Sequence, residues 1–143
     1  MAIKEVFFED VKEGSKMPEF VSAPLSEVQF VMYAGASGDF NPLHTVHAFG
    51  EKAGYGGVIG HGMLSMGIAG QGLTEWLGNK ALKKFSVSFR SPVKAKDVIT
   101  VKGVVTKKYT EGNDNCIDID VVAENQRGET VVTGNATAAL SSK

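Results

Sequence analysis

The spacing of apolar residues changes once along this chain, and the change restricts its fold more than any other feature. Residues 62–77 read GMLSMGIAGQGLTEWL, which places apolar residues on almost every side of a helix. Because such a helix has no polar face to turn toward water, other elements must cover it. From residue 82 onward, apolar and polar residues alternate, as in strands with one buried face. We therefore expect an α+β fold in which one antiparallel sheet wraps around a long central helix.

The alternating half of the chain divides into four expected strands. They cover residues 82–90, 98–109, 116–124 and 130–140. The first is expected to bury Phe85, Val87 and Phe89. Turn-forming sequences separate the last three strands, namely TEGNDN and NQRG. Because strands joined by short turns are usually neighbours, an antiparallel meander is expected.

The first half of the chain is expected to hold a short strand at 18–23 and one helix. Ser26 is suited to cap the N-terminus of this helix, with Gln29 as its capping-box partner. Gly35 and Gly38 should end it near residue 36. The apolar residues at helical spacing are Val28, Val31, Met32 and Gly35.

Residues 37–60 lie between the two helices and are rich in glycine, which disfavours regular structure. A short helix is compatible with residues 46–53. A segment of this length without regular structure is unusual in a small domain unless it is functional. We therefore expect it to carry an active site.

An acid and an imidazole, Asp39 and His44, stand five positions apart in this segment. Pro42 fixes its own φ and biases Asn41 away from the helical region, so the chain must turn between them. A turn would let both side chains face one pocket and hold a water, an arrangement suited to general acid–base catalysis. The alternatives are that Asp39 is a turn residue and that His44 is a structural histidine.

His61 and Gly62 open the expected central helix. The first N–H groups of a helix lack internal partners and carry partial positive charge, so they suit a polarised carbonyl oxygen. Gly62 has no side chain to block such an approach and is the candidate donor. His61 is a candidate for substrate contact. The alternative is that it is structural or orients neighbouring residues. Met63 and Met66 are either core residues or the lining of an apolar acyl channel.

Several other site types are not supported by the sequence. The spacing of His44, His47 and His61 matches no standard metal pattern and no cysteine is near, so no metal site is expected. The chain also lacks the G-x-G-x-x-G, phosphate-loop and G-x-S-x-G motifs, which argues against nucleotide binding and serine hydrolysis.

Composition limits the possible partners. A net charge of -1 gives no reason to expect nucleic-acid or membrane binding. Arg90 is expected to be solvated, with contact to a phosphate-bearing ligand as the alternative. The single cysteine, Cys116, fits a reducing compartment, so we expect a cytoplasmic protein. A length of 143 residues predicts one domain, covering residues 1–143.

The sequences YAGASGDFNPLH and HGML, at residues 33–44 and 61–64, closely resemble the MaoC-like dehydratases. This family includes the R-specific enoyl-CoA hydratases, also called hydratase 2. Its signature Ser-Gly-Asp-x-Asn-Pro-x-His is met at every specified position, from Ser37 to His44. The resemblance extends loosely over nearly the whole chain. It implies a single hot-dog fold with an overhanging active-site segment, and a homodimer whose sheets join edge to edge.

The resemblance also implies a reaction, the reversible syn hydration of a trans-2-enoyl thioester to a (3R)-3-hydroxyacyl thioester. By analogy, Asp39 and His44 activate the water, and the N–H of Gly62 binds the thioester carbonyl oxygen. The substrate-binding candidates are Asn41, His61, Met63 and Met66. CoA or the phosphopantetheine of an acyl-carrier protein enters only as part of the acyl thioester substrate, so no separate cofactor is expected.

Two alternatives remain, a hot-dog acyl-CoA thioesterase and a non-catalytic partner subunit of a heterodimeric dehydratase. The Gly-Asp-x-Asn-Pro-x-His spacing favours hydration over the first, and the presence of both Asp39 and His44 argues against the second. Some family members carry a hydroxyl residue one to two turns into the central helix, where this chain has Gly67 and Gly70. The preferred acyl length is therefore left open.

Overall fold

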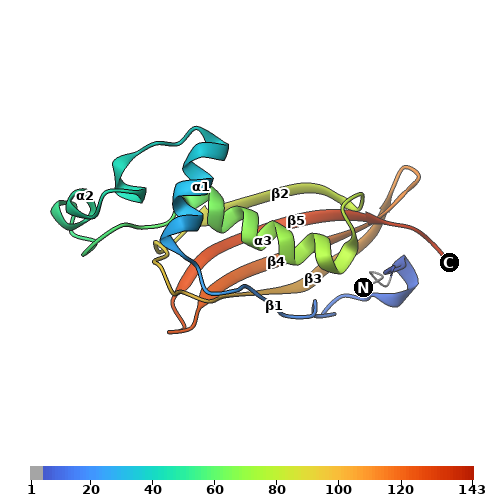
Figure 1. The fold of residues 1–143 in the computed structure, drawn as a ribbon. Coiled ribbons are helices and arrows are strands. Elements are labelled where there is room, and N and C mark those ends of the chain that lie inside the picture. Colours follow the sequence, from blue (N-terminus) through green and yellow to red (C-terminus); the bar gives the residue numbers. More distant parts are fainter. Residues whose placement is uncertain (1–4) are drawn as a thin grey trace.

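A computed structural model describes residues 5–143 of the chain, so the first four residues of the predicted domain 1–143 lie outside the described part. One antiparallel sheet of five strands has the order β1-β3-β4-β5-β2 (Figure 1). The strands are β1 (Phe20–Val21), β2 (Leu82–Phe89), β3 (Ile99–Glu111), β4 (Asp114–Asn125) and β5 (Thr130–Leu140). The remaining elements are η1 (Phe8–Asp10), α1 (Glu27–Ser37), η2 (Pro42–His44), α2 (His47–Lys52) and α3 (Gly62–Leu77). The predicted α+β class and the central helix are thus confirmed.

The predicted meander is correct for three strands and wrong for the fourth. Tight turns join β3 to β4 and β4 to β5, which pair in chain order. In contrast, β2 pairs with β5, from Leu82 opposite Ala138 to Phe89 opposite Val132. The reason is the connection at residues 90–98, which does not return directly alongside β2 but crosses the sheet to β3, beyond β5 and β4 (Figure 1). Both β1 and β2 therefore lie at sheet edges.

Helix α3 lies across one face of the sheet (Figure 1). Its buried apolar residues are Leu64, Ile68, Ala69, Leu73 and Leu77. A methyl group at Gly72 would lie 3.1 Å from Cβ of Phe20 and 3.2 Å from Cβ of Val101, so the helix approaches the sheet closely there. At Gly67 the same group would meet nothing within 4 Å, and Met63 is 57% exposed. The expectation of a helix covered on every side is therefore wrong for one face.

Helix α1 begins and ends where the sequence predicts. The Oγ of Ser26 accepts a hydrogen bond from the N–H of Gln29 at 3.1 Å, and Gly38 follows the helix with φ 77°. The buried residues, however, are Phe30 and Ala34. The expected apolar face is largely solvent-exposed, with Val28 at 67%, Val31 at 56% and Met32 at 69%. Phe30 takes its place because its ring packs against the backbone at Gly60, where no Cβ intervenes.

Among the described residues, no helix has the combination of length and apolarity that crossing a bilayer requires.

The connection that leads into β3 is held by one buried carboxylate, Asp97, which is 2% exposed. Its oxygens accept hydrogen bonds from Nη1 of Arg127 at 2.8 Å, the N–H of Lys94 at 3.0 Å and Nε2 of Gln126 at 3.1 Å. Burial would raise the pKa of this carboxyl, but these donors lower its pKa below the ordinary value. The group therefore joins the loop before β3 to the β4–β5 hairpin.

Replacing Arg127 with Gln should lower the free energy of unfolding by about 2 kcal/mol at pH 7, because a buried carboxylate loses its charged donor. The folded-state pKa of Asp97 is lowered, so its contribution is present above the ordinary value of about 3.9 and is lost as the pH falls through the lowered pKa. Urea unfolding of the wild type and Arg127→Gln across this range checks both expectations.

The matched control is Lys102→Gln, which breaks the half-exposed ion pair with Glu124 at 2.9 Å. This change should cost no more than about 0.5 kcal/mol. Equal losses in the two variants would contradict the role assigned to Asp97.

Candidate active site

The segment before α3 projects beyond the end of the sheet, on the side opposite the chain termini (Figure 1). Its turn is built locally: Oδ1 of Asp39 accepts the N–H of Asn41 at 3.2 Å. Oδ1 of Asn41 then accepts the N–H of Leu43 at 3.0 Å, where η2 begins at Pro42. The predicted turn between the acid and the imidazole is present, and Asn41 caps it rather than lining a pocket.

His44 is 8% exposed, and one hydrogen bond determines which ring nitrogen carries the proton. Its Nδ1 lies 2.8 Å from the carbonyl oxygen of Ile59. Because a carbonyl oxygen only accepts, Nδ1 must be the donor in the neutral ring, and Nε2 keeps its lone pair. That Nε2 lies 3.7 Å from Oδ2 of Asp39, whose side chain is 52% exposed.

The 3.7 Å separation is too long for a direct hydrogen bond between Nε2 of His44 and Oδ2 of Asp39. Both atoms are acceptors when the carboxyl is ionised and the ring is neutral, so a shared donor satisfies both. A water that donates one hydrogen to each would keep its oxygen lone pairs free to react. The pair therefore has the geometry for general acid–base chemistry on a water molecule.

His61 supports this pair from beneath. It is 1% exposed, and its Nε2 lies 3.1 Å from the carbonyl oxygen of Asp39, to which it donates. Its ring stacks on that of His44 with centroids 3.7 Å apart and lies 4.8 Å from the ring of Tyr33. Its Nδ1 has no partner among the described residues, which fits a neutral ring protonated on Nε2. The side chain orients the acid and the base and has almost no surface left for substrate.

Gly62 begins α3, and its N–H finds no acceptor among the described residues. A cavity of about 290 Å³ lies in front of it and is also lined by His44, Ser65, Phe89 and Arg90. A donor at a helix N-terminus and the imidazole of the acid–base pair therefore face the same space. Asp39 stands at its edge, outside the lining residues.

The structure does not bring every candidate to this cavity. Met63 is exposed and Met66 is half-buried on the free face of α3, and neither lines the cavity. His47 points to α1, where its Nε2 lies 3.0 Å from Oε2 of Glu27. The sequence therefore places three histidines in one segment, but only two of them meet.

Sequence reasoning missed two lining residues that have recognisable signals. Ser65 is 3% exposed and stands three positions after Gly62, which places both on one side of the helix. Phe89 was expected to be buried but is 50% exposed, since β2 extends past the start of α3. A methyl group at Gly62 would lie 3.5 Å from its ring, so Phe89 forms a wall of the cavity.

A metal ion fits this cluster poorly. Asp39, His44 and His61 each offer one ligand atom, and these atoms lie within 4.8 Å of one another. Ligands of a zinc ion must direct their lone pairs at one point. The two imidazoles are stacked with only 24° between their planes, so their lone pairs lie in two nearly parallel planes and do not converge on one point.

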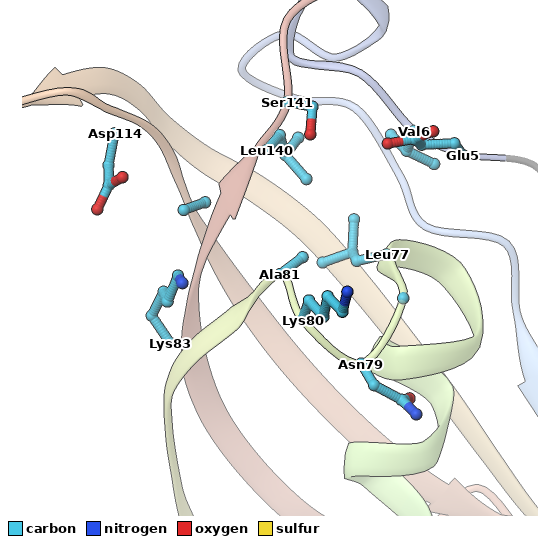
Figure 2. Close-up of a pocket in the computed structure, with 12 residues that line it drawn as sticks. Glu5, Val6, Leu77, Asn79, Lys80, Ala81, Lys83, Asp114, Leu140 and Ser141 are labelled. Atoms are coloured by element: carbon cyan, nitrogen blue, oxygen red, sulfur yellow. The ribbon is translucent and has the colours of Figure 1, made fainter.

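A larger cavity, of about 630 Å³, lies near the end of α3 that is far from the acid–base pair. Figure 2 shows Leu77 of α3, Ala81 just before β2 and Leu140 of β5 around this cavity. Lys80 and Lys83 stand at its rim, and no histidine is among its lining residues. Size alone therefore does not identify the reactive site in this molecule.

Comparison with known proteins agrees with this geometry. A family model described as "MaoC like domain" matches residues 11–127. An (R)-specific enoyl-CoA hydratase from Rhodospirillum rubrum is 32% identical over 138 residues, which cover 92% of this chain and 89% of that protein. The structure of R-hydratase PhaJ1 from Pseudomonas aeruginosa has a TM-score of 0.86 at 26% identity, covering 97% of this chain and 88% of that one.

Another relative is much longer than this chain. A protein named "Probable dehydratase NIT22" from Ajellomyces capsulatus is 33% identical over 89 residues, which cover 60% of this chain but 24% of that protein. The region similar to this chain is therefore a small part of the A. capsulatus protein and most of the R. rubrum hydratase. The matched range, the whole-length relative and the shared hot-dog fold together show that this chain belongs to the MaoC-like domain family.

Proposed function

We propose that this protein is a hydro-lyase that reversibly adds water across the double bond of trans-2-enoyl thioesters. The observation that carries the proposal is the pair of facing acceptors, Nε2 of His44 and Oδ2 of Asp39, 3.7 Å apart at the mouth of a cavity. Such a pair binds a water through both of its hydrogens and leaves the oxygen directed at a substrate. The membership in the MaoC-like family agrees with this class of reaction.

In the hydration direction, the water oxygen bonds to the β-carbon while His44 and Asp39 take up its proton. The electron pair of the double bond moves toward the thioester carbonyl, whose oxygen gains negative charge. The N–H of Gly62, which has no acceptor among residues 5–143, is placed to stabilise that charge with help from the helix dipole. The α-carbon then receives the proton from the acid–base pair, and dehydration is the reverse.

Oxygen and proton both arrive from the side of the substrate that faces His44 and Asp39, so the addition is syn. We assign the (3R)-3-hydroxyacyl thioester as product, in line with the R-specificity in the name of the R. rubrum relative. The acyl group arrives on CoA or on an acyl-carrier protein, and the chemistry requires no separate cofactor or metal. The free thiol of Cys116 fits a reducing cytoplasm.

A thioesterase is the second candidate, because the same cavity would let the same water attack the carbonyl carbon. The fold serves both reactions and does not decide between them. The spacing of Asp39, Asn41, Pro42 and His44 favours hydration, since it is the signature spacing of the dehydratases. A non-catalytic partner subunit is the less favoured reading, because both members of the pair are present and meet.

We also propose that the protein is a homodimer formed along β2. This strand is at the sheet edge, and the neighbouring face of α3 exposes Met63 and leaves open space at Gly67. A two-fold axis would pair β2 with its copy in antiparallel fashion and continue the sheet. In this pairing, the start of β2 in one copy lies near Phe89, at the end of β2 in the other copy. The cavity of Figure 2 in one copy would then be near Phe89 of the other.

Crotonyl-CoA is the first substrate to test, by loss of the enoyl absorbance and chiral analysis of the product. Asp39→Asn and His44→Ala should each lower kcat by about 10²- to 10⁴-fold, because the first replaces a proton-accepting carboxylate with an amide and the second removes the imidazole. His47→Ala removes an exposed histidine of the same segment and should stay within about twofold. Thermal unfolding of all three variants separates lost chemistry from lost folding.

Release of free thiol from crotonyl-CoA without hydration would replace the hydratase with the thioesterase. Near-normal turnover by folded Asp39→Asn or His44→Ala would contradict the assigned mechanism.

The tautomers of the two stacked rings offer an independent test. Long-range ¹H–¹⁵N spectra of histidine-labelled protein at about pH 8, where free imidazole is neutral, should show His44 protonated on Nδ1 and His61 on Nε2. If His44 instead carries its proton on Nε2, it has no lone pair for water, and the proposed base is lost.

Gly67→Arg should convert the dimer to a monomer, because the free face of α3 tolerates the side chain in one copy but not against a second. Analytical ultracentrifugation measures the mass. Val104→Arg, at an exposed position of β3, is the control and should leave a dimer intact. A wild-type protein with the mass of one chain, or a Gly67→Arg variant that remains dimeric, would rule out this interface.

A further inference from the structure

The cavity in front of Gly62 has one open end and one buried end. The ring of Phe89 forms a wall at the open end and is 50% exposed. The lining residues of the other end are buried, namely Ile59, Ser65 and Val93. The carrier of a thioester is long and must extend into solvent, so it has room only at the open end. The buried end is therefore left for the end of the acyl chain.

The buried end is closed at Gly60, which also lines the cavity. A methyl group at Gly60 would lie 2.5 Å from Cγ2 of Val93 and 3.0 Å from Cε1 of Phe30, so no free space lies on that side of the backbone. The N–H of Gly60 also donates to the carbonyl oxygen of Val93 at 2.8 Å, and Phe30 is fully buried. Two chain segments and a core ring thus form a closed floor, which includes the side chain of Val93.

The first turn of α3 limits the same end of the cavity. Ser65 is the last residue of α3 that lines it, and Ile68 and Ala69 in the next turn are packed in the core. Ser65 stands three positions after Gly62, a rise of about 4.5 Å along the helix. A chain whose carbonyl oxygen lies at Gly62 therefore has space for few further carbons, because a cavity of about 290 Å³ must also hold the reacting water.

The side wall at Ser65 is polar as well as close. This residue is 3% exposed, and its hydroxyl forms no hydrogen bond within the described part of the chain. A methylene pressed against it would bury the hydroxyl without a partner, which is unfavourable. A short acyl chain avoids this cost because it ends before it covers Ser65.

We infer that the site takes short enoyl groups, of about four to six carbons, and that Val93 determines this limit. The inference rests on the proposed function, which brings an enoyl thioester into this cavity. The limit is steric: a longer chain enters only if the floor at Gly60 and Val93 moves, and displacing well-packed groups is costly. Val93 is thus a specificity-determining residue.

The test is a series of trans-2-enoyl-CoA substrates with four, six, eight and ten carbons. For the wild type, kcat/KM should stay within about fivefold from crotonyl-CoA to hexenoyl-CoA and fall at least about 100-fold by decenoyl-CoA. Equal kcat/KM over the whole series would overturn the inference, because the acyl chain would then leave the cavity by another route.

Val93→Ala removes two methyl groups from the floor. It should raise the ratio of kcat/KM for octenoyl-CoA to kcat/KM for crotonyl-CoA about tenfold, since the opened space accepts additional methylenes. A loss of folded protein lowers both values equally and leaves this ratio unchanged, so the ratio reports the site and not the stability.

Val58→Ala is the matched control. It removes the same two methyl groups from a valine that is also buried but does not line the cavity. This variant should leave the ratio of octenoyl-CoA to crotonyl-CoA as in the wild type. A Val93→Ala ratio equal to that of Val58→Ala would contradict the role of Val93.

Calorimetric binding of the saturated thioesters butyryl-CoA and decanoyl-CoA requires no turnover and separates this inference from the proposed reaction. A protein that binds butyryl-CoA at least about tenfold more tightly than decanoyl-CoA, yet hydrates no enoyl-CoA, would refute the hydratase and keep the limit on chain length. A protein that hydrates all four enoyl-CoA substrates equally well would do the reverse.

Discussion

The buried imidazole of His61 is the contact on which the arrangement of the site depends. It is the N-cap residue of α3, and the sheet holds this helix in place. Its Nε2 holds the carbonyl of Asp39, and its ring supports that of His44. One side chain thereby sets the overhanging turn against the N-terminus of α3. The acid, the base and the free N–H of Gly62 are positioned by the core although the segment between them is largely irregular.

The sheet provides this support only because α3 lies very close to it. At Gly72 a methyl group would already press on Phe20 and Val101, and the apolar residues around it are almost fully buried. The opposite face of the helix, at Met63 and Gly67, has no such cover. Helix α3 is therefore closely packed on the face toward the sheet and open on the face beside β2, where we place a second copy.

Sequence reasoning was most successful where the signal is local. The Ser26 cap, the termination of α1 at Gly38 and the extent of α3 follow from backbone chemistry within a few residues, and each is confirmed. It failed for the rotation of α1 about its axis and for the path of the connection across the sheet, because both depend on residues far apart in the sequence. The buried face of α1 is set by contact between Phe30 and Gly60, and the place of β2 beside β5 is set by the path of residues 90–98.

The sequence alone determined that the protein has an α+β fold around a central helix, and it placed Asp39, His44 and Gly62 in one functional segment. It did so because periodicity and turn chemistry are local properties, and because the signature spacing is rigid. Only the tertiary structure decided that His61 lies beneath the pair while Met63 lies away from the cavity. It also brought Phe89 to the wall of the cavity, since β2 and the start of α3 meet only when the helix packs on the sheet.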